Sequence, residues 1–399
     1  MRDGGMGNTR GHLEIAAVFL KIGALSYGGP AIFGVIQSEI QEKRSWMSKE
    51  AFLEGVALVN MLPGPPAVQL SIYIGHECGG WRGGVIAGLS FALPAFFILM
   101  LLTWLYTAYG NLGTARDAFY GLGPVVLAIF AVAVWRLGRA GVRSPAQIAI
   151  GLASAALIAI TPIGIAPVLL LAGCTGVALY HSRAWGLGAA GVVMAAISLT
   201  ELLLFPTPHV GLAPPGPPGL RDLAVFFMQV GAFTFGGGIT ILAFVQDQVV
   251  NEFHWLTAQE FIDGLALGQL TPGPILMLAA YIGYKLAGLA GAVISACAIF
   301  LPAFVLMLSI VPVVRRLRDL LWLKAAMKGI TGAVIGVLAV SLGRLLPHAA
   351  PDAFTWILFG LTIAAMMLWR VGPLPLMLGG AIGGVLVRLK PLQRLRELT

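Results

Sequence analysis

Two proline–glycine–proline segments, one in each half of the chain, carry residues that could bind a small anion. They are Pro63, Gly64 and Pro65, and Pro272, Gly273 and Pro274. Two prolines within three residues cannot lie in a continuous helix, because proline lacks an N–H donor and its ring clashes with the preceding turn. A helix that restarts after such a break presents unpaired N–H groups and the positive end of its dipole, which attract anions. These segments, called the PGP segments below, therefore predict a backbone anion site.

Polar side chains and glycines accompany both PGP segments. Two glycine-rich segments lie upstream, and they are Gly28, Gly29 and Pro30, and Gly236, Gly237 and Gly238. The polar candidates near the breaks are Lys21, Ser26, Asn60, Gln69, Gln229, Thr234, Gln269 and Thr271. Hydroxyl, amide and backbone N–H donors with one ammonium would form a cage for a tetrahedral oxyanion. Lys21 aligns with Gln229 of the other half, so only one half supplies a cation.

Each candidate also has a structural interpretation that the sequence leaves open. Lys21 lies near the start of its apolar segment, so its ammonium can equally extend to the lipid headgroups. The glycine-rich segments can serve as packing contacts or kinks, since small residues let membrane helices approach closely. Four carboxylates align in pairs and either carry protons for coupling or act as solvated helix ends: Glu39 with Asp247, and Glu54 with Asp263. Arg136 and Arg344 also align, as interfacial anchors or as parts of a gate.

The composition excludes a soluble protein and argues against nucleic-acid binding. The 399 residues are 58% hydrophobic and 11% charged, whereas soluble proteins carry about 25% charged residues. Apolar runs long enough to cross a bilayer recur along the chain, so lipid must solvate most of the surface. The net charge of +8 comes from basic residues between apolar segments, as is typical of short cytoplasmic loops. We therefore expect the lipid bilayer, and not nucleic acid, as a partner.

The chain is an internal duplication. The matched segments are FLKIGALSYGGP (19–30) with FMQVGAFTFGGG (227–238), FLEGVALVNMLPGP (52–65) with FIDGLALGQLTPGP (261–274), and LPAF (93–96) with LPAF (301–304). The separation of matched residues stays almost constant from the first match to the last, which a shared bias toward glycine, alanine and leucine would not produce. The sequence therefore divides into a first repeat at 1–183, a linker at 184–220 and a second repeat at 221–399.

Each repeat predicts a first helix that ends at the glycine-rich segment, and then a short helix that enters the PGP segment. The short helix begins after Ser48 or after Thr257, and Glu260 has the spacing of a capping box with Thr257. With about a dozen residues it reaches about half-way through the hydrocarbon, which puts PGP near mid-membrane. Four further apolar segments complete each repeat: 84–108, 118–137, 145–161 and 165–181, with counterparts 289–312, 322–343, 353–369 and 373–388.

These elements, with the unpaired apolar segment 184–205, predict an all-α polytopic membrane protein with broken or re-entrant helices and about thirteen membrane segments. One extra span turns the second repeat upside down if each repeat crosses an even number of times. A cluster of basic residues follows the fourth apolar segment of the first repeat but the third apolar segment of the second. Under the positive-inside rule, this shift by one loop favours an inverted tandem repeat. The two clusters are Arg136, Arg139 and Arg143, and Arg315, Arg316 and Arg318. The basic tail from Arg388 to Arg396 argues against inversion, and re-entrant PGP segments would change the parity.

Enzyme chemistry finds little support in the sequence. HECGG at 76–80 lacks the second histidine of a zinc-protease motif, and neither a G-x-S-x-G elbow nor a Walker lysine loop occurs. Histidines and cysteines do not cluster into a metal-ligand set. We therefore expect no enzyme activity, no metal and no cofactor. Without a nucleotide-binding domain, transport must draw on an ion gradient or on the membrane potential.

An ordered set of motifs runs through both repeats: FLKIGALSYGGP, FLEGVALVNMLPGP, IGH and FALPAFF, then FTFGGG, FIDGLALGQLTPGP and FLPAF. This set resembles the chromate ion transporter family in its long two-domain form, and the resemblance covers almost the whole chain. It implies a secondary transporter that exports chromate from the cytoplasm across the bacterial inner membrane and so confers chromate resistance. It also implies that the glycines and prolines of the glycine-rich and PGP segments are the family's motif residues.

Three alternatives stay open beside chromate export. Chromate is a structural mimic of sulfate, so a sulfate or general oxyanion carrier would use the same site. A membrane-embedded chromate reductase would need a redox cofactor or a reactive thiol pair, and the sequence shows neither. A channel or scaffold would not depend on an energised membrane. The sequence also leaves a homodimer open.

Overall fold

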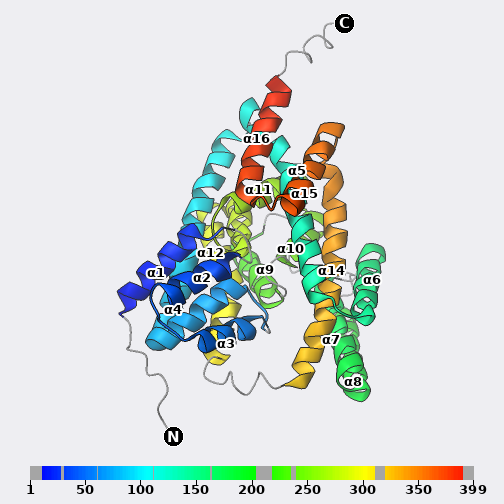
Figure 1. The fold of residues 1–399 in the computed structure, drawn as a ribbon. Helices are drawn as coiled ribbons and strands as arrows, with labels where there is room; N and C mark the ends of the chain where they lie inside the picture. Colours follow the sequence, from blue (N-terminus) through cyan, green and yellow to red (C-terminus); the bar gives the residue numbers. More distant parts are fainter. Residues whose placement is uncertain are drawn as a thin grey trace.

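The computed structural model describes residues 11–27, 31–60, 62–110, 112–161, 164–203, 218–234, 240–310 and 320–389, and the regular elements in these ranges are all helices (Figure 1). The first repeat contains α1 (His12–Leu25), α2 (Ala31–Gln37), η1 (Ser38–Glu42), α3 (Lys49–Val59), α4 (Pro66–Tyr109), α5 (Gly113–Gly141), α6 (Pro145–Ile160) and α7 (Ile165–Tyr180). The linker contributes α8 (Arg183–Leu203). The second repeat contains α9 (Leu220–Ala232), α10 (Thr240–Val245), η2 (Gln246–Glu252), α11 (Ala258–Leu270), η3 (Ile275–Met277), α12 (Leu278–Ile310), α14 (Leu321–Ala349), α15 (Ala353–Leu368) and α16 (Pro373–Leu389). The two repeats thus have equivalent elements in the same order.

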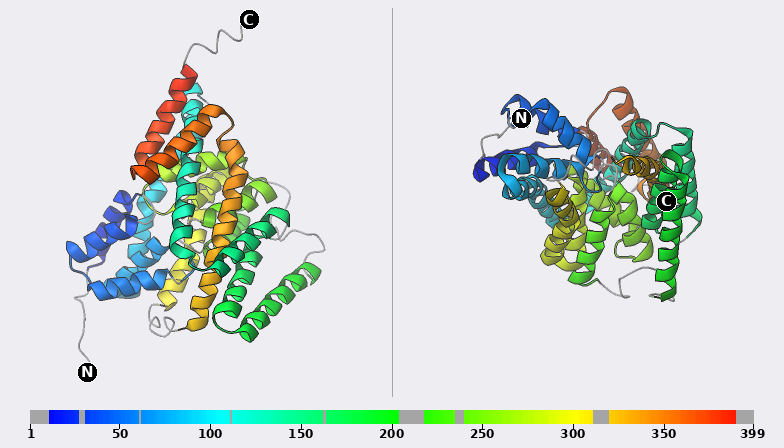
Figure 2. Two further views of the ribbon diagram at one scale, coloured as in Figure 1. Left: turned by 45° about the vertical axis from the view of Figure 1, so that its right-hand side comes forward. Right: turned by 90° about the horizontal axis from the view of Figure 1, so that it is seen from below.

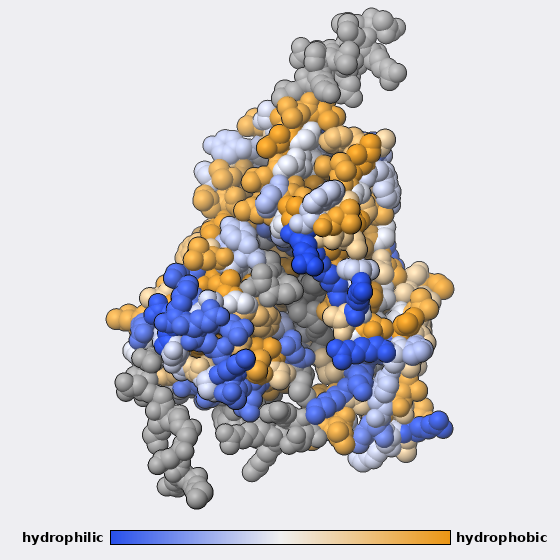
Figure 3. All heavy atoms as spheres, in the orientation of Figure 1, coloured by the Kyte–Doolittle hydropathy of each residue, from blue (hydrophilic) through white to orange (hydrophobic). Residues whose placement is uncertain are grey.

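Four helical segments of the described chain are long and apolar enough to cross a membrane: α4, α5, η3 with α12, and α14. Four shorter apolar helices accompany them: α6, α7, α15 and α16. Large apolar side chains such as Phe97, Leu152 and Leu361 face outward from these helices, and Figure 3 shows apolar side chains over much of one face of the molecule. Such a surface requires lipid as its solvent. The chain is therefore an integral membrane protein, while the count of about thirteen segments stays a prediction.

Each PGP segment joins the two arms of a helical hairpin. In the first repeat α3 and the start of α4 are the arms, and the Tyr73 hydroxyl donates to the Ala51 carbonyl oxygen across 3.4 Å. In the second repeat α11 and the start of α12 are the arms, and the Tyr281 hydroxyl donates to the Glu260 carbonyl oxygen across 2.8 Å. These contacts join the outer ends of the arms, so the chain enters and leaves each hairpin at the same end.

The two longest helical segments, α4 and α12, each reverse direction after the hairpin. Gly80 in α4 combines a φ of 62° with a ψ of −160°, and Gly288 in α12 a φ of 59° with a ψ of −153°, a region that essentially only glycine adopts. As a result Gly75 packs directly against Gly83, two residues that a straight helix would separate by about 12 Å. The second repeat has the same reversal. Each PGP hairpin is thereby followed by a long apolar helix that runs back beside it.

Equivalent helices of the two repeats lie side by side and run in opposite directions. The second part of α4 packs against the second part of α12, and α5 packs against α14. In both pairs, rising residue numbers in one helix meet falling numbers in the other. The contacts are Gly84 with Leu308, Gly88 with Phe304, Gly123 with Ala349, and Gly141 with Thr331. The two repeats are therefore related by a reversal of direction at these helices.

The repeats are also interleaved. Helix α5 of the first repeat packs on α15 and α16 of the second, while α14 of the second repeat packs on α6 and α7 of the first. Figure 1 shows α15 and α16 beside the upper part of α5, and α7 beside the lower part of α14; Figure 2 shows the same arrangement from the side and from below. Glycines lie at the contacts: Gly121 meets Gly380, and Gly329 meets Ala172. Small residues allow this backbone-to-backbone approach.

Candidate anion-transport site

Both PGP segments interrupt their helices, as the prolines predict. The central glycines, Gly64 and Gly273, have φ values of 122° and 106°. Residues with a Cβ are strained at such values, because the side chain meets the backbone. The following prolines, Pro65 and Pro274, are extended and precede the helix or turn that restarts the chain. Each turn therefore depends on glycine at its centre and on proline at its exit.

Each PGP turn contacts the other repeat, which the sequence did not predict. The Gly64 N–H donates to the Thr234 carbonyl oxygen across 2.6 Å, and the Gly273 N–H donates to the Ser26 carbonyl oxygen across 2.8 Å. Ser26 directly follows α1, and Thr234 closely follows α9. The two hydrogen bonds are equivalent by the duplication. The candidate residues of one repeat are thus completed by those of the other.

The alanines of the duplicated LPAF motif support the same two turns. A Cβ placed on Gly273 would lie 2.7 Å from the Ala95 Cβ in α4, and one on Gly64 would lie 3.3 Å from the Ala303 Cβ in α12. Again each turn contacts the other repeat. The sequence showed LPAF as a repeated motif but gave it no role. Its recurrence at the spacing of the PGP segments was the signal that could have identified it.

The backbone donors left for an anion are those of the first turns after each break. The N–H groups of Gly64 and Gly273 are occupied by protein carbonyl oxygens. The first N–H groups of a helix have no acceptor within that helix. In α4 these belong to Ala67 and Val68, since Pro66 has no N–H; in the second repeat they include Ile275. The helix N-termini, more than the glycines, therefore offer donors to an anion.

Two buried side chains beside the turns keep polar atoms without a partner in the described part of the chain. Ser26 is fully buried, and its hydroxyl has no hydrogen-bond partner. Gln69 is also fully buried; its amide nitrogen donates to the Pro63 carbonyl oxygen across 2.5 Å, but its amide oxygen accepts nothing. An unpaired buried polar group costs about 1–3 kcal/mol. A ligand that offers hydrogen bonds at the turns would recover part of this cost.

The other predicted site residues differ in how deeply they are buried. Thr234 and Thr271 are buried, and each hydroxyl donates to a carbonyl oxygen of the helix that it follows. Asn60 and Gln229 are exposed, and Gln269 is half-buried. The six residues of the glycine-rich segments lie outside the described residues: Gly28, Gly29, Pro30, Gly236, Gly237 and Gly238. The structure thus places Thr234 and Gln69 at the first PGP segment and Ser26 at the second.

Lys21 forms an ion pair with Glu39. Its ammonium lies 2.9 Å from the carboxylate, and its side chain is 50% exposed. Lys43 lies 2.8 Å and Arg44 3.7 Å from the same carboxylate. Hydrogen bonds from Lys43 and Lys21 lower the pKa of Glu39 to about 2. Glu39 therefore stays ionised at physiological pH and holds Lys21 near η1.

Arg136 and Arg344 connect the repeats through helix C-termini. Arg344 donates to the Ile158 carbonyl oxygen across 2.8 Å, and Arg136 donates to the Met366 carbonyl oxygen across 3.1 Å. These two bonds are equivalent by the duplication, and a cation is stabilising at a helix C-terminus. Arg344 also pairs with Asp247 at 2.8 Å. Both arginines therefore hold one repeat on the other, a role that neither the anchor nor the gate interpretation described.

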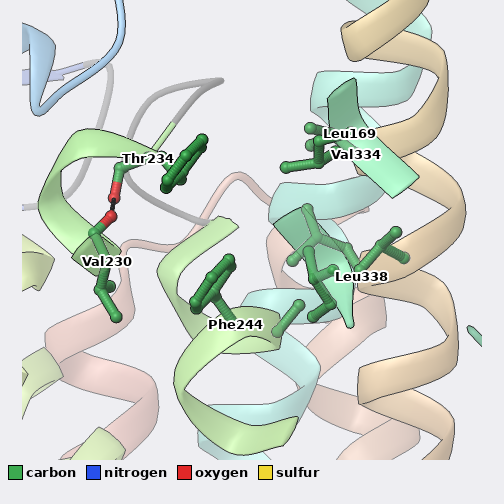
Figure 4. A pocket seen from close by; sticks show the side chains of 10 residues that line it. Leu169, Val230, Thr234, Phe244, Val334 and Leu338 are labelled. Atoms are coloured by element: carbon green, nitrogen blue, oxygen red, sulfur yellow. Dashed lines mark hydrogen bonds between the residues drawn. The ribbon is translucent and has the colours of Figure 1, made fainter. Parts of the chain in front are cut away.

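A pocket beside Thr234 is lined by α7, α9, α10 and α14 (Figure 4). Its lining includes Leu169, Phe244, Val334 and Leu338, and among the described lining residues Thr234 alone has a polar side chain. Figure 4 shows the Thr234 hydroxyl bonded to the Val230 carbonyl oxygen. An apolar lining cannot compensate a desolvated dianion. This pocket is therefore unsuited to binding a dianion.

Interleaved sets of apolar helices, with broken helices where the repeats meet, define a membrane transporter built from two related halves. The chain belongs to the chromate transporter family, whose profile matches residues 13–179 and 221–385. It is a transport protein and not an enzyme.

Full-length relatives agree with this family. The chain is 34% identical to the probable chromate transport protein of Synechococcus elongatus, over 94% of this chain and 95% of the relative. It is 31% identical to the chromate transport protein of Cupriavidus metallidurans, over 92% and 91%. It is 30% identical to the chromate transport protein of Pseudomonas aeruginosa, over 90% and 87%. No solved structure matches the chain.

Proposed function

We propose that this protein is a secondary transporter that exports chromate from the cytoplasm across the bacterial inner membrane by alternating access. The observation that carries the proposal is the reciprocal pair of hydrogen bonds, Gly64 to Thr234 and Gly273 to Ser26. Broken helices at matching positions of two repeats are typical of transporter binding sites. Here each break is completed by the other repeat, so a relative movement of the repeats changes both turns together.

The proposal includes a tandem repeat inverted across the membrane, with repeats at 1–183 and 221–399 and a linker at 184–220. The opposite directions of α4 and α12, and of α5 and α14, support inversion. The same-end entry and exit of each hairpin supports re-entrant PGP segments. The basic cluster at 315–318, which suggested inversion in the sequence, lies outside the described residues.

Membrane potential alone can drive export of a dianion. Each elementary charge that crosses the membrane gains about 2.3 kcal/mol per 100 mV, and the interior of the cell is negative. Both helix N-termini at the PGP turns, with the buried Ser26 hydroxyl, would replace part of the hydration of chromate. All these groups come from one chain, so the proposed site does not need a homodimer.

The direct test is accumulation of labelled chromate. Cells that express the protein should hold less total chromium and survive higher doses than cells with an empty vector. Equal accumulation in both would contradict export. A fall in chromate without a fall in total chromium would instead indicate reduction. In everted vesicles, competition by sulfate at comparable concentrations would indicate a general oxyanion carrier with the same tetrahedral site.

Lys21→Gln is expected to weaken chromate transport a few-fold without unfolding the protein, because it removes a cation from α1, the helix that leads to Ser26 at the second PGP turn. Lys43→Gln is the matched control, since Lys43 bonds to the same Glu39 oxygen and is also exposed. The measurement is the concentration dependence of chromate uptake into everted vesicles. A higher apparent KM in the Lys21 variant alone supports a role toward the anion. Equal effects of the two variants would show that Lys21 acts only through Glu39.

A further inference from the structure

Asp263 is a buried carboxylate at the contact between the repeats. It lies on α11, the first arm of the second PGP hairpin, and is 6% exposed. One carboxylate oxygen accepts a hydrogen bond from the Tyr106 hydroxyl of α4 across 2.7 Å. The other accepts from the Gln259 amide of α11 across 2.9 Å. Asp263 is therefore hydrogen-bonded to neutral donors, and the one on α4, Tyr106, joins the second PGP hairpin to the other repeat.

Lys285, a cation beside Tyr106, forms its ion pair with Glu260 and not with Asp263. Lys285 of α12 forms an ion pair with Glu260 at 2.9 Å and lies over the Tyr106 ring. Tyr281 of α12 donates to the Glu260 carbonyl oxygen. On the other elements that pack on α11, two carboxylates are paired with arginines: Asp117 of α5 with Arg388 of α16, and Asp247 of η2 with Arg344 of α14. In the described part of the chain, no ion pair includes Asp263.

This environment distinguishes Asp263 from the three other candidate carboxylates. Glu39 lies among three basic side chains, Asp247 pairs with Arg344, and Glu54, the counterpart of Asp263, is exposed. An ionised carboxylate removed from water is costly unless a cation or several donors compensate it. Protonation removes the charge and with it most of that cost. Asp263 is thus the carboxylate whose proton occupancy should depend most on a change of structure.

We propose that Asp263 binds and releases the proton that couples inward proton movement to chromate export; this inference rests on the proposed transport function. Ionised Asp263 accepts charge-assisted hydrogen bonds from Tyr106 and Gln259, and the one from Tyr106 holds α11 on α4. A proton from water converts the carboxylate to a carboxylic acid, and no other bond is formed or broken except these hydrogen bonds. The weaker contact frees the hairpin to move. The proton is released on the opposite side when the carboxylate is next exposed to water.

The test separates exchange from net transport in proteoliposomes that contain the purified protein. Exchange of labelled for unlabelled chromate at equal pH needs no net proton movement, whereas accumulation driven by an acidic interior does. Wild-type protein should do both. Asp263→Asn should keep exchange within about threefold of wild type and lose pH-driven accumulation at least tenfold. Glu54→Gln, the change at the equivalent position of the other repeat, should keep both activities.

Tyr106→Phe provides a second, independent readout. It removes a donor that stabilises the ionised carboxylate, so the pH dependence of exchange should shift to higher pH while folding is kept. An unshifted profile would overturn the proposal. So would pH-driven accumulation by Asp263→Asn at the wild-type level, or loss of exchange together with accumulation in that variant. Absence of chromate exchange in wild-type protein would instead overturn the proposed function.

Discussion

Gly273→Val is expected to abolish chromate transport in a protein that still reaches the membrane. Valine at a φ of 106° is strained, at a cost of about 1–3 kcal/mol. Its Cβ would also lie 2.7 Å from the Ala95 Cβ, which pushes the turn away from Ser26 and breaks the hydrogen bond between the repeats. Since about 1.4 kcal/mol corresponds to tenfold in rate, we expect at least a tenfold loss. Uptake of labelled chromate by everted vesicles measures it.

Gly268→Val is the matched control for this experiment. Gly268 lies on α11 in the same hairpin, and nothing lies within 4 Å of a Cβ added there. Gly64→Val should also impair transport, because its φ is 122°, but its closest obstacle is the movable end of the Gln69 side chain. If Gly273→Val and Gly268→Val transport alike, the turn does not determine transport.

Gly329→Leu is expected to prevent folding and not merely transport. A Cβ on Gly329 would overlap the Ala172 carbonyl oxygen of α7, and it would lie 2.9 Å from the Gly176 Cα. These obstacles are backbone atoms, so a side-chain rotation cannot relieve them. Overpacking typically costs about 1–3 kcal/mol even where side chains can adjust. Fluorescence-detected size-exclusion chromatography of a tagged protein should show aggregate in place of a monodisperse peak.

Gly343→Leu serves as the control on the same helix, because a Cβ at Gly343 has nothing within 4 Å. It should leave the chromatographic peak and chromate transport unchanged. A folded, active Gly329→Leu protein would mean that α7 and α14 do not approach as closely as the structure describes.

Local sequence rules predicted the elements and the breaks well. The Ser48 hydroxyl accepts from the Ala51 N–H across 3.2 Å, and Thr257 with Glu260 forms the expected capping box. Helix α8 lies in the unpaired apolar segment 184–205. These features depend on neighbouring residues, so single-sequence reasoning can find them. The duplication aligned the two turns and the two arginines, and in the structure the contacts of each occur in equivalent pairs.

The exchange of partners between the repeats could not be predicted, because it depends on which apolar face meets which. Apolar periodicity identifies a buried face but not its neighbour. The reversals at Gly80 and Gly288 were missed for a related reason, since glycine is common throughout membrane helices. For the site, proximity of Ser26 to Gly273 needs the fold. An alignment of the two repeats makes Asp263 and Glu54 equivalent, so it cannot show that Asp263 is buried and Glu54 exposed.

The interleaving also dictates when each part of the chain can finish packing during synthesis. Helix α5 packs on α15 and α16, the last of the described helices, and Gly121 of α5 meets Gly380 and Gly384 of α16. When the ribosome has completed the first repeat, α15 and α16 have not yet been synthesised, so α5 lacks these neighbours. When α14 is synthesised, by contrast, its neighbours α6 and α7 are already present. Packing of the first repeat is thus completed only when the second has been translated, and a chain truncated before α15 would leave α5 without two of the helices that it packs on.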